Sequence, residues 1–521
     1  MVEQSTVAKK VDEQQRPHRS PLAILVPVAA LMIVAVSVWL RLRVLNAPYD
    51  IDSYDEGVYW QSLRAMSEGH MLYGDIFYSQ PPFFLLAVFP MYVLLGKTIW
   101  AARMGIVIIS LLGMLGAYLL GKALAGRAGA LVALLLLALQ PLFIGSSVVL
   151  QADSPSMALT LLAVALAFLW WQHRHKGLTG TCLAALCGVV LALSIGTKLF
   201  GLSALVPFGL LILAHLWLDH RESARSESGA RLRALARTLQ PLGVGLLACA
   251  VTAGVLLIPF AGSWHQLLDN VITFHVASGE SYTGAPANVM PTIKALLLSL
   301  LPLTALCGTV LALIRRDARV WPLLAWLGVT IALLWQQKPL FTHHFIILLP
   351  PLVGLSALGV NGLVRVTTGR LRTLLQPSLL LALLVILIVL PWNAREAYTT
   401  ISTINGHSQS EEAQQNLRVA ADLRQALPPG QQVLTDAQFL AGLADRTTPP
   451  ALVDTSGVRI DAGYVTAQSL IDAASSPEVH AVLIYSGRFT KPQLAPFISW
   501  LHDHYRLVQD YGNQRGLWVK V

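Results

Sequence analysis

The chain has 521 residues, 55% of them hydrophobic and only 12% charged, with a mean hydropathy of +0.60. Several apolar runs reach the roughly 18 residues that cross a bilayer, so the composition excludes a soluble protein and predicts a polytopic membrane protein. The formal net charge of +9 does not indicate nucleic-acid binding, because Lys and Arg lie mainly in short loops between apolar runs, where they set membrane orientation. All four cysteines fall in apolar runs without ligand-like spacing, which predicts neither disulfides nor a zinc site.

The first apolar run, residues 22–40, follows a basic, polar leader at residues 1–21. The run is longer than the roughly 7 to 15 residues of a signal-peptide core, and no small-residue cleavage site follows it. We therefore predict a retained membrane span, with the leader disordered and cytoplasmic. An acidic loop at residues 46–102 then lies on the outer side.

Further spans follow in chain order. With the first they make about eleven, at residues 104–120, 128–150, 157–171, 181–195, 199–218, 242–260, 292–314, 320–335, 345–363 and 374–392. In this arrangement the basic loops all face the cytoplasm and the acidic first loop does not, as charge-biased insertion requires.

A further apolar segment, residues 83–95, is short and contains Pro90. Counting it as a crossing would put Lys122 and Arg127 outside. We therefore predict an amphipathic or re-entrant helix that lies along the outer interface.

The last part of the chain, residues 393–521, has the hydropathy of a soluble domain. Short buried strands are predicted at residues 433–434, 451–453, 481–484 and 516–521, and helices at 415–426, 466–474 and 491–504. The predicted fold is therefore mostly α, a transmembrane helix bundle with outer interfacial helices and a C-terminal extracytoplasmic α/β domain. Because this domain shows no Gly-rich phosphate loop and no Cys/His cluster, we expect it to contact an acceptor or stabilise the outer loops.

Three acids stand out because they follow apolar spans. Asp55 and Glu56 begin an apparent amphipathic helix after the first span, and Asp153 lies between two spans with hardly any loop around it. If the basic loops set the orientation, all three reach the same outer face. Carboxylates at these places could simply cap helices, yet an ionisable residue at a membrane boundary is expensive without a partner or a use. We interpret the other acids of this loop, Asp50, Asp52 and Asp75, as solvated.

Cations and imidazoles gather on the same predicted face: Arg103, Lys198, Lys338, His343 and His344. Interfacial Lys and Arg often only reach toward lipid headgroups, and adjacent histidines point to different helix faces, so we expect at most one histidine to meet the acids. Together with the acids, these residues supply what transfer from a lipid phosphate needs. A carboxylate can accept the proton of an incoming hydroxyl or amine, while positive groups hold the departing phosphate.

The run DEGVYWQSLRAMSEGHMLYGDIFYSQPPFFLL, with QADSPSMAL further on, resembles the polytopic GT-C glycosyltransferases, in the branch of protein O-mannosyltransferases and aminoarabinose transferases of lipid A. The resemblance covers residues 22–392. It implies a polyprenyl-phosphate-linked sugar donor used at the outer leaflet, and inversion at the anomeric carbon. It also implies that Asp55 is the catalytic carboxylate, with Glu56 beside it and Asp153 as a second acid. The position before the Pro-Pro pair, often charged in relatives, is Gln80 here; we expect no required metal, although a divalent ion could serve.

The predicted function is therefore a membrane glycosyltransferase that passes a sugar from a lipid phosphate to an envelope lipid, glycan or protein. Lys198, His343, His344, Arg103 and Lys338 would bind the donor phosphate. The expected location is the plasma membrane, with the N-terminus cytoplasmic. A transporter or flippase is the alternative, and a membrane-anchored receptor a third; spans largely free of polar residues, with ionisable groups collected at one surface, favour the enzyme.

Overall fold

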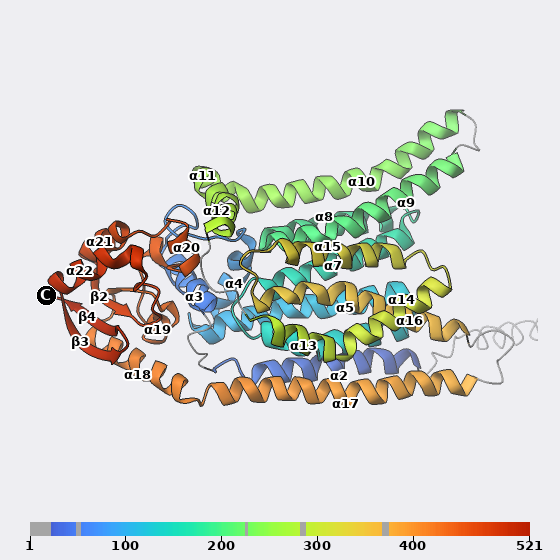
Figure 1. The fold of residues 1–521 in the computed structure, drawn as a ribbon. Helices are drawn as coiled ribbons and strands as arrows, with labels where there is room; N and C mark the ends of the chain where they lie inside the picture. The colour runs from blue at the N-terminus through green and yellow to red at the C-terminus, as the bar shows by residue number, and fades with distance from the viewer. Residues whose placement is uncertain (1–21, 48–53, 224–227, 282–287, 367–374) are drawn as a thin grey trace, which may run out of the picture.

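The computed structural model describes residues 22–47, 54–223, 228–281, 288–366 and 375–521. Figure 1 shows a long helix bundle with the C-terminal domain seated at one end. The predicted leader and the acids Asp50 and Asp52 lie outside the described residues.

The bundle is built from apolar helices, most of which run between its two ends (Figure 1). They are α2 (Leu22–Leu42), α5 (Ile99–Ala138), α7 (Asp153–His173), α8 (Leu178–Thr197), α9 (Leu205–Ser223), α10 (Ser228–Leu257), α13 (Met290–Leu298), α14 (Leu300–Ile314), α15 (Val320–Gln336), α16 (Leu349–Val366) and α17 (Leu375–His407). Each predicted span falls on helix. Among the described residues six helices are long and apolar enough to cross a membrane, or seven if the pair α13 and α14, bent by 57°, makes one span. The number of about eleven stays a prediction.

Helix α5 is two antiparallel arms joined by a tight turn. Ala125 and Gly126 leave the helical region, and Gly126 has a φ of 67°, which glycine adopts without strain. Gly121 and Gly129 meet across the turn, where a side chain on Gly121 would overlap the Gly129 carbonyl oxygen. The predicted spans 104–120 and 128–150 are thus the arms of a hairpin, and the second continues into α6 (Pro141–Ser146).

Short helices lie between the bundle and the C-terminal domain (Figure 1). They are α3 (Tyr54–Ser67), α4 (Phe83–Leu94), α11 (Trp264–Leu268) and α12 (Phe274–Ser281). Three 3₁₀ helices, η1 (Leu199–Ala204), η2 (Ile258–Ser263) and η4 (Thr342–Leu348), and the π-helix η3 (Asp269–Thr273) accompany them. The segment 83–95 is therefore a helix of 12 residues, whose Phe84 and Leu85 are buried in the cluster that also holds Leu63 of α3. Its place at the membrane interface remains a prediction.

The C-terminal domain has one four-stranded sheet in the order β1-β2-β4-β3. β1 (Gln432–Thr435) and β2 (Val479–Ile484) are parallel, and β4 (Arg515–Lys520) is antiparallel to β2 and to β3 (Tyr505–Gly512). The helices are α18 (Glu411–Ala426), α19 (Gln438–Leu443), α20 (Gly457–Asp461), α21 (Ala467–Ser475) and α22 (Ala495–His504), with 3₁₀ turns η6 (Pro450–Leu452) and η7 (Pro492–Leu494).

One predicted strand is wrong and one observed strand was not predicted. The segment 451–453 lies mostly in the turn η6, because two prolines precede it and proline fixes φ and removes a backbone donor. The strand β3 was not expected, because its burial pattern is mostly exposed and it lacks the apolar alternation that marks a strand. The other predicted strands and helices coincide with β1, β2, β4, α18, α21 and α22.

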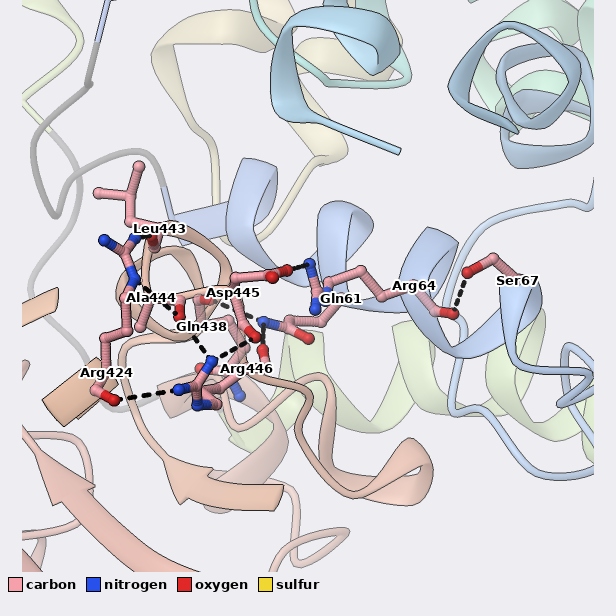
Figure 2. A network of polar contacts seen from close by, with 9 residues as sticks. All are labelled: Gln61, Arg64, Ser67, Arg424, Gln438, Leu443, Ala444, Asp445 and Arg446. Atoms are coloured by element: carbon pink, nitrogen blue, oxygen red, sulfur yellow. Dashed lines mark hydrogen bonds and ion pairs between the residues drawn. The ribbon is translucent and has the colours of Figure 1, made fainter. Parts of the chain in front are cut away.

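The C-terminal domain packs against α3 through polar contacts (Figure 2). The Gln61 side-chain amide donates to the carbonyl oxygens of Gln438 and Arg446, at 3.3 and 3.0 Å, and Arg64 pairs with Asp445 at 2.8 Å. Gly57 lies against α19, where a side chain would lie 2.9 Å from the Phe439 Cα. The helix and the domain therefore form one packed unit.

Close packing of α14 on α16 generates the first prediction. Gly308 lies against the Leu355 carbonyl oxygen, where a methyl group would overlap it. Gly308→Ala should lower the free energy of unfolding by about 1–3 kcal/mol through overpacking. Gly328→Ala, in the helix α15 with nothing within 4 Å, should leave stability unchanged or raise it, since alanine is the better helix former. Thermal unfolding of the detergent-solubilised protein compares the two; equal melting temperatures would contradict the packing argument.

Candidate active site

A cavity of about 1010 Å³ lies where the bundle, the helix α3 and the C-terminal domain meet. Its walls come from distant parts of the chain, and its ionisable lining residues are Asp55, Lys198, His275, Glu280, Lys338, His343, His344, Asp454 and Arg488, with Tyr54, Tyr59 and Tyr78. Acids, cations and phenols thus face one cavity.

Asp55 presents its carboxylate to this cavity from the first turn of α3. Its side chain is 44% exposed, and its Oδ2 atom lies 3.9 Å from the His343 Nε2 atom. Enclosure by the protein raises the pKa of Asp55 above its ordinary value, while the nearby His343 and Lys198 act in the opposite direction. A carboxylate with a raised pKa is a stronger proton acceptor than one in water.

Asp153 binds Lys198. The Lys198 ammonium donates to both carboxylate oxygens of Asp153, at 2.8 and 2.9 Å. The Asp153 side chain is 4% exposed and the Lys198 side chain 12%. Asp153 begins α7, and Lys198 lies at the break between α8 and η1. Lys198 lines the cavity and Asp153 lies behind it. Asp153 therefore positions a cation whose charge also reaches Asp55.

The two histidines converge, contrary to the prediction that at most one would meet the acids. Ligand atoms of His343, His344 and Asp153 all lie within 4.8 Å of one another. The reason is local: the histidines lie in the 3₁₀ turn η4, not in an α-helix, and the Phe341 N–H donates to the His344 Nδ1 atom at 3.2 Å. This group could hold a metal ion only if Lys198 moved off Asp153, since the ammonium already contacts both carboxylate oxygens.

Glu56 and Arg103 do not face the cavity. The Arg103 guanidinium donates two hydrogen bonds to the Glu56 carboxylate, at 2.8 and 2.7 Å, and both side chains are fully buried. Arg103 also donates to the carbonyl oxygens of Leu45 and Ala47, and Glu56 accepts from the Leu150 N–H, each at 2.8 Å. We correct both predictions: this pair is structural, because a carboxylate engaged in this way cannot touch a substrate.

Sequence reasoning missed the contribution of the C-terminal domain. Arg488 stacks over the Tyr54 ring at 3.9 Å, and the Tyr54 hydroxyl donates to Asp454 at 3.2 Å. Both Arg488 and Asp454 line the cavity, about 400 residues beyond Asp55 in sequence. No local motif marks them, so only the docking of the domain reveals their place.

A second cavity, of about 820 Å³, adjoins the first. Gln151, Thr342 and His343 line both. Most of its other lining residues are apolar or small, among them Pro141, Leu142, Val149, Ala295, Leu296, Leu298 and Trp392. His343 therefore stands at the junction of a polar and a more apolar space.

Comparison with known proteins shows which family and which solved structures the chain resembles. Residues 79–260 match the family described as dolichyl-phosphate-mannose-protein mannosyltransferase, and no curated protein matches the sequence. The chain shares its fold with solved structures over 94% or more of its length, in agreement with the resemblance stated above.

Among solved structures, the chain is similar to ArnT from Cupriavidus metallidurans in the apo state, with a TM-score of 0.63 and 14% identity over 94% of this chain and 97% of that one. It is similar to ArnT bound to undecaprenyl phosphate, with a TM-score of 0.63 and 15% identity over 96% and 98% of the two chains. The archaeal oligosaccharyltransferase AglB from Archaeoglobus fulgidus, in complex with an inhibitory peptide and a dolichol-phosphate, gives a TM-score of 0.54 and 13% identity over 94% of this chain and 74% of that one.

The buried Glu56–Arg103 ion pair makes a testable prediction about stability. Glu56→Gln should lower the free energy of unfolding by about 3–5 kcal/mol, because it leaves the buried Arg103 without its counter-charge. Glu68→Gln, the same change at an exposed position just beyond α3, should have little effect. Thermal unfolding of both variants provides the measurement.

A double variant separates structure from catalysis. Glu56→Gln with Arg103→Gln should lose less stability than the sum of the two single changes, because two neutral amides replace a broken ion pair. A Glu56→Gln variant with the original melting temperature but no activity would return Glu56 to the mechanism.

Proposed function

We propose that this protein is a membrane glycosyltransferase that moves a sugar from a polyprenyl-phosphate-linked donor to an envelope acceptor at the outer face of the plasma membrane. The observation that carries the proposal is one cavity in which the Asp55 carboxylate, with its raised pKa, faces Lys198 and His343. A base and positive groups in one cavity are what phosphate departure from a sugar requires.

The reaction needs two groups with opposite tasks. The acceptor hydroxyl or amine attacks the anomeric carbon from the face opposite the phosphate, and Asp55 accepts the proton of that hydroxyl or amine. The bond between the anomeric carbon and the phosphate oxygen breaks, and its electron pair leaves with polyprenyl phosphate. Inversion at the anomeric carbon follows. Lys198, held by Asp153, with His343, His344 and Lys338, stabilises the charge that develops on the departing phosphate. These groups are preorganised, so they need no rearrangement as that charge forms.

The second cavity suits the lipid. It adjoins the polar cavity at His343, and part of its wall is made of apolar side chains of the bundle such as Leu142, Leu296 and Trp392, so a polyprenyl chain can lie along that part while its phosphate reaches Lys198. The similarity to ArnT, solved with undecaprenyl phosphate, and to AglB, solved with a dolichol-phosphate, supports this assignment. Arg488 and Asp454 of the C-terminal domain then border the acceptor side.

Basic residues support the orientation. They gather at the turns remote from the cavity, among them Arg127, Arg174, Lys176, Arg315, Arg316 and Arg319. The Arg319 guanidinium donates to the Leu124 carbonyl oxygen at 2.8 Å, which brings two of these turns together. With this end cytoplasmic, the cavity and the C-terminal domain lie outside.

The central test removes the proposed base. Asp55→Asn should reduce sugar transfer at least a hundredfold, because the amide cannot accept the acceptor's proton, while binding of polyprenyl phosphate is retained. Asp75→Asn, a matched change at an exposed acid outside the cavity, should keep full activity. Mass spectrometry of envelope glycolipids and glycoproteins from cells with and without the protein first identifies the missing sugar, and transfer of that sugar is then assayed. Near-normal turnover by Asp55→Asn would remove this residue from the mechanism.

The pH dependence of transfer tests the electrostatics of Asp55. The carboxylate must be ionised to act as a base, so the rate should be highest above its pKa and fall as the pH decreases through it. His343→Gln removes a group that lowers this pKa, so the acid limb of the rate profile should move to higher pH. His275→Gln, which also changes a cavity histidine, should leave the limb in place. A limb that moves to lower pH in His343→Gln would contradict the assignment.

A further inference from the structure

A second group of ionisable side chains lies at the end of the bundle remote from the catalytic cavity. His215 and Asp219 are one helical turn apart on α9, and His175 lies in the short turn between α7 and α8. Their ligand atoms all lie within 4.8 Å of one another. The proposed function uses none of the three residues.

Two of the atoms that meet here are buried and have no hydrogen-bond partner, the His215 Nδ1 atom and the Asp219 Oδ1 atom. They face each other at 3.5 Å. The His215 side chain is 1% exposed, and its ring packs edge-on against Trp170. Polar atoms buried without partners cost about 1–3 kcal/mol each, and a cation bound between these two atoms would remove that cost.

The contacts around the group fix which atoms can bind. The His215 Nε2 atom contacts the Thr238 carbonyl oxygen of α10 at 3.3 Å, and since a carbonyl only accepts, Nε2 carries the hydrogen. In the neutral ring Nδ1 then holds a lone pair toward Asp219. The Thr238 hydroxyl donates to the other carboxylate oxygen, Asp219 Oδ2, at 2.6 Å, which leaves Oδ1 directed at the histidines. Such outer contacts orient ligands at metal sites.

The distances fit a small tetrahedral ion. Zinc–nitrogen and zinc–oxygen bonds of about 2.0–2.2 Å place neighbouring ligand atoms of a tetrahedron about 3.3–3.5 Å apart. The Asp219 Oδ1 atom lies 3.5 Å from His215 Nδ1 and 3.7 Å from His175 Nε2. His175 is exposed, so an ion has a route in from solvent.

We propose that His175, His215 and Asp219 bind one divalent transition-metal ion of the zinc class. Imidazole nitrogens with one carboxylate are a donor set that zinc accepts, and the ion neutralises Asp219. The three ligands and Thr238 join the α7–α8 turn to α9 and α10, so the ion fastens three parts of the bundle. It acts on stability, away from the sugar-transfer chemistry.

The test measures zinc in the full-length protein, purified in detergent with an affinity tag that contains no histidine. Elemental analysis after equilibration with Zn²⁺ and removal of free metal should find one ion per chain. His175→Ala, which alters an exposed side chain, should weaken Zn²⁺ binding at least tenfold, and Asp219→Asn should do the same. His220→Ala, an exposed histidine on the same helix, should keep full binding. Co²⁺ in place of zinc should give the visible absorption of a tetrahedral site in the wild type and lose it in His175→Ala.

Thermal unfolding gives a readout independent of metal analysis. Zn²⁺ should raise the melting temperature of the wild type and of His220→Ala but not that of His175→Ala, because only an ion bound to the folded state stabilises it. The proposal is overturned if zinc content and melting temperature are the same in His175→Ala as in the wild type. It is equally overturned if His343→Ala, which removes a ligand of the cluster beside the catalytic cavity, abolishes binding that His175→Ala leaves intact.

Discussion

The buried ion pair between Glu56 and Arg103 is the contact on which the geometry of the candidate active site depends. It joins the first turn of α3 to the first arm of α5, and through the carbonyl oxygens of Leu45 and Ala47 it also fixes the end of the first span. A buried ion pair adds little net stability over an apolar contact, but breaking it leaves an uncompensated charge. Its value here is therefore positional: Asp55 is the residue next to Glu56, so fixing one carboxylate to the bundle aims the other into the cavity.

The opposite side of α3 is held by the C-terminal domain. Gly57 allows the backbone of α19 to approach, Gln61 donates to the carbonyl oxygens of Gln438 in α19 and of Arg446 just beyond it, and Tyr54 contacts Asp454 and Arg488. A helix held between the bundle and a separate domain has little freedom to tilt. The domain thus does more than cover the outer loops, because the contacts that hold α3 also bring Asp454 and Arg488 to the cavity wall.

Two groups of ionisable side chains lie at opposite ends of this bundle, and within each group the side chains lie close to one another. At one end Asp153 holds Lys198 and the histidines converge on the same point; at the other, His215 and Asp219 face each other across a short gap. A charged or polar side chain inside an apolar bundle is tolerated when it has a partner or a ligand. The same constraint therefore leads to the proposed catalytic arrangement at one end and to the proposed metal site at the other.

The sequence by itself determined the positions of the helices and the chemistry available at their ends. Apolar runs and the Gly or Pro residues between them are local signals, which is why the predicted spans fall on helices and why Asp55, Asp153 and Lys198 were found beside them. Only the tertiary structure decided which of these groups meet. From the sequence Glu56 is a candidate for a second catalytic acid, but in the fold Arg103 pairs with it, and Asp153 lies behind Lys198. Both histidines converge because they lie in a 3₁₀ turn. Arg488, near the C-terminal end of the chain, contacts Tyr54 beside Asp55. The physical reason is that helix formation depends on near neighbours, whereas the partner of a buried charge is chosen by packing between segments hundreds of residues apart.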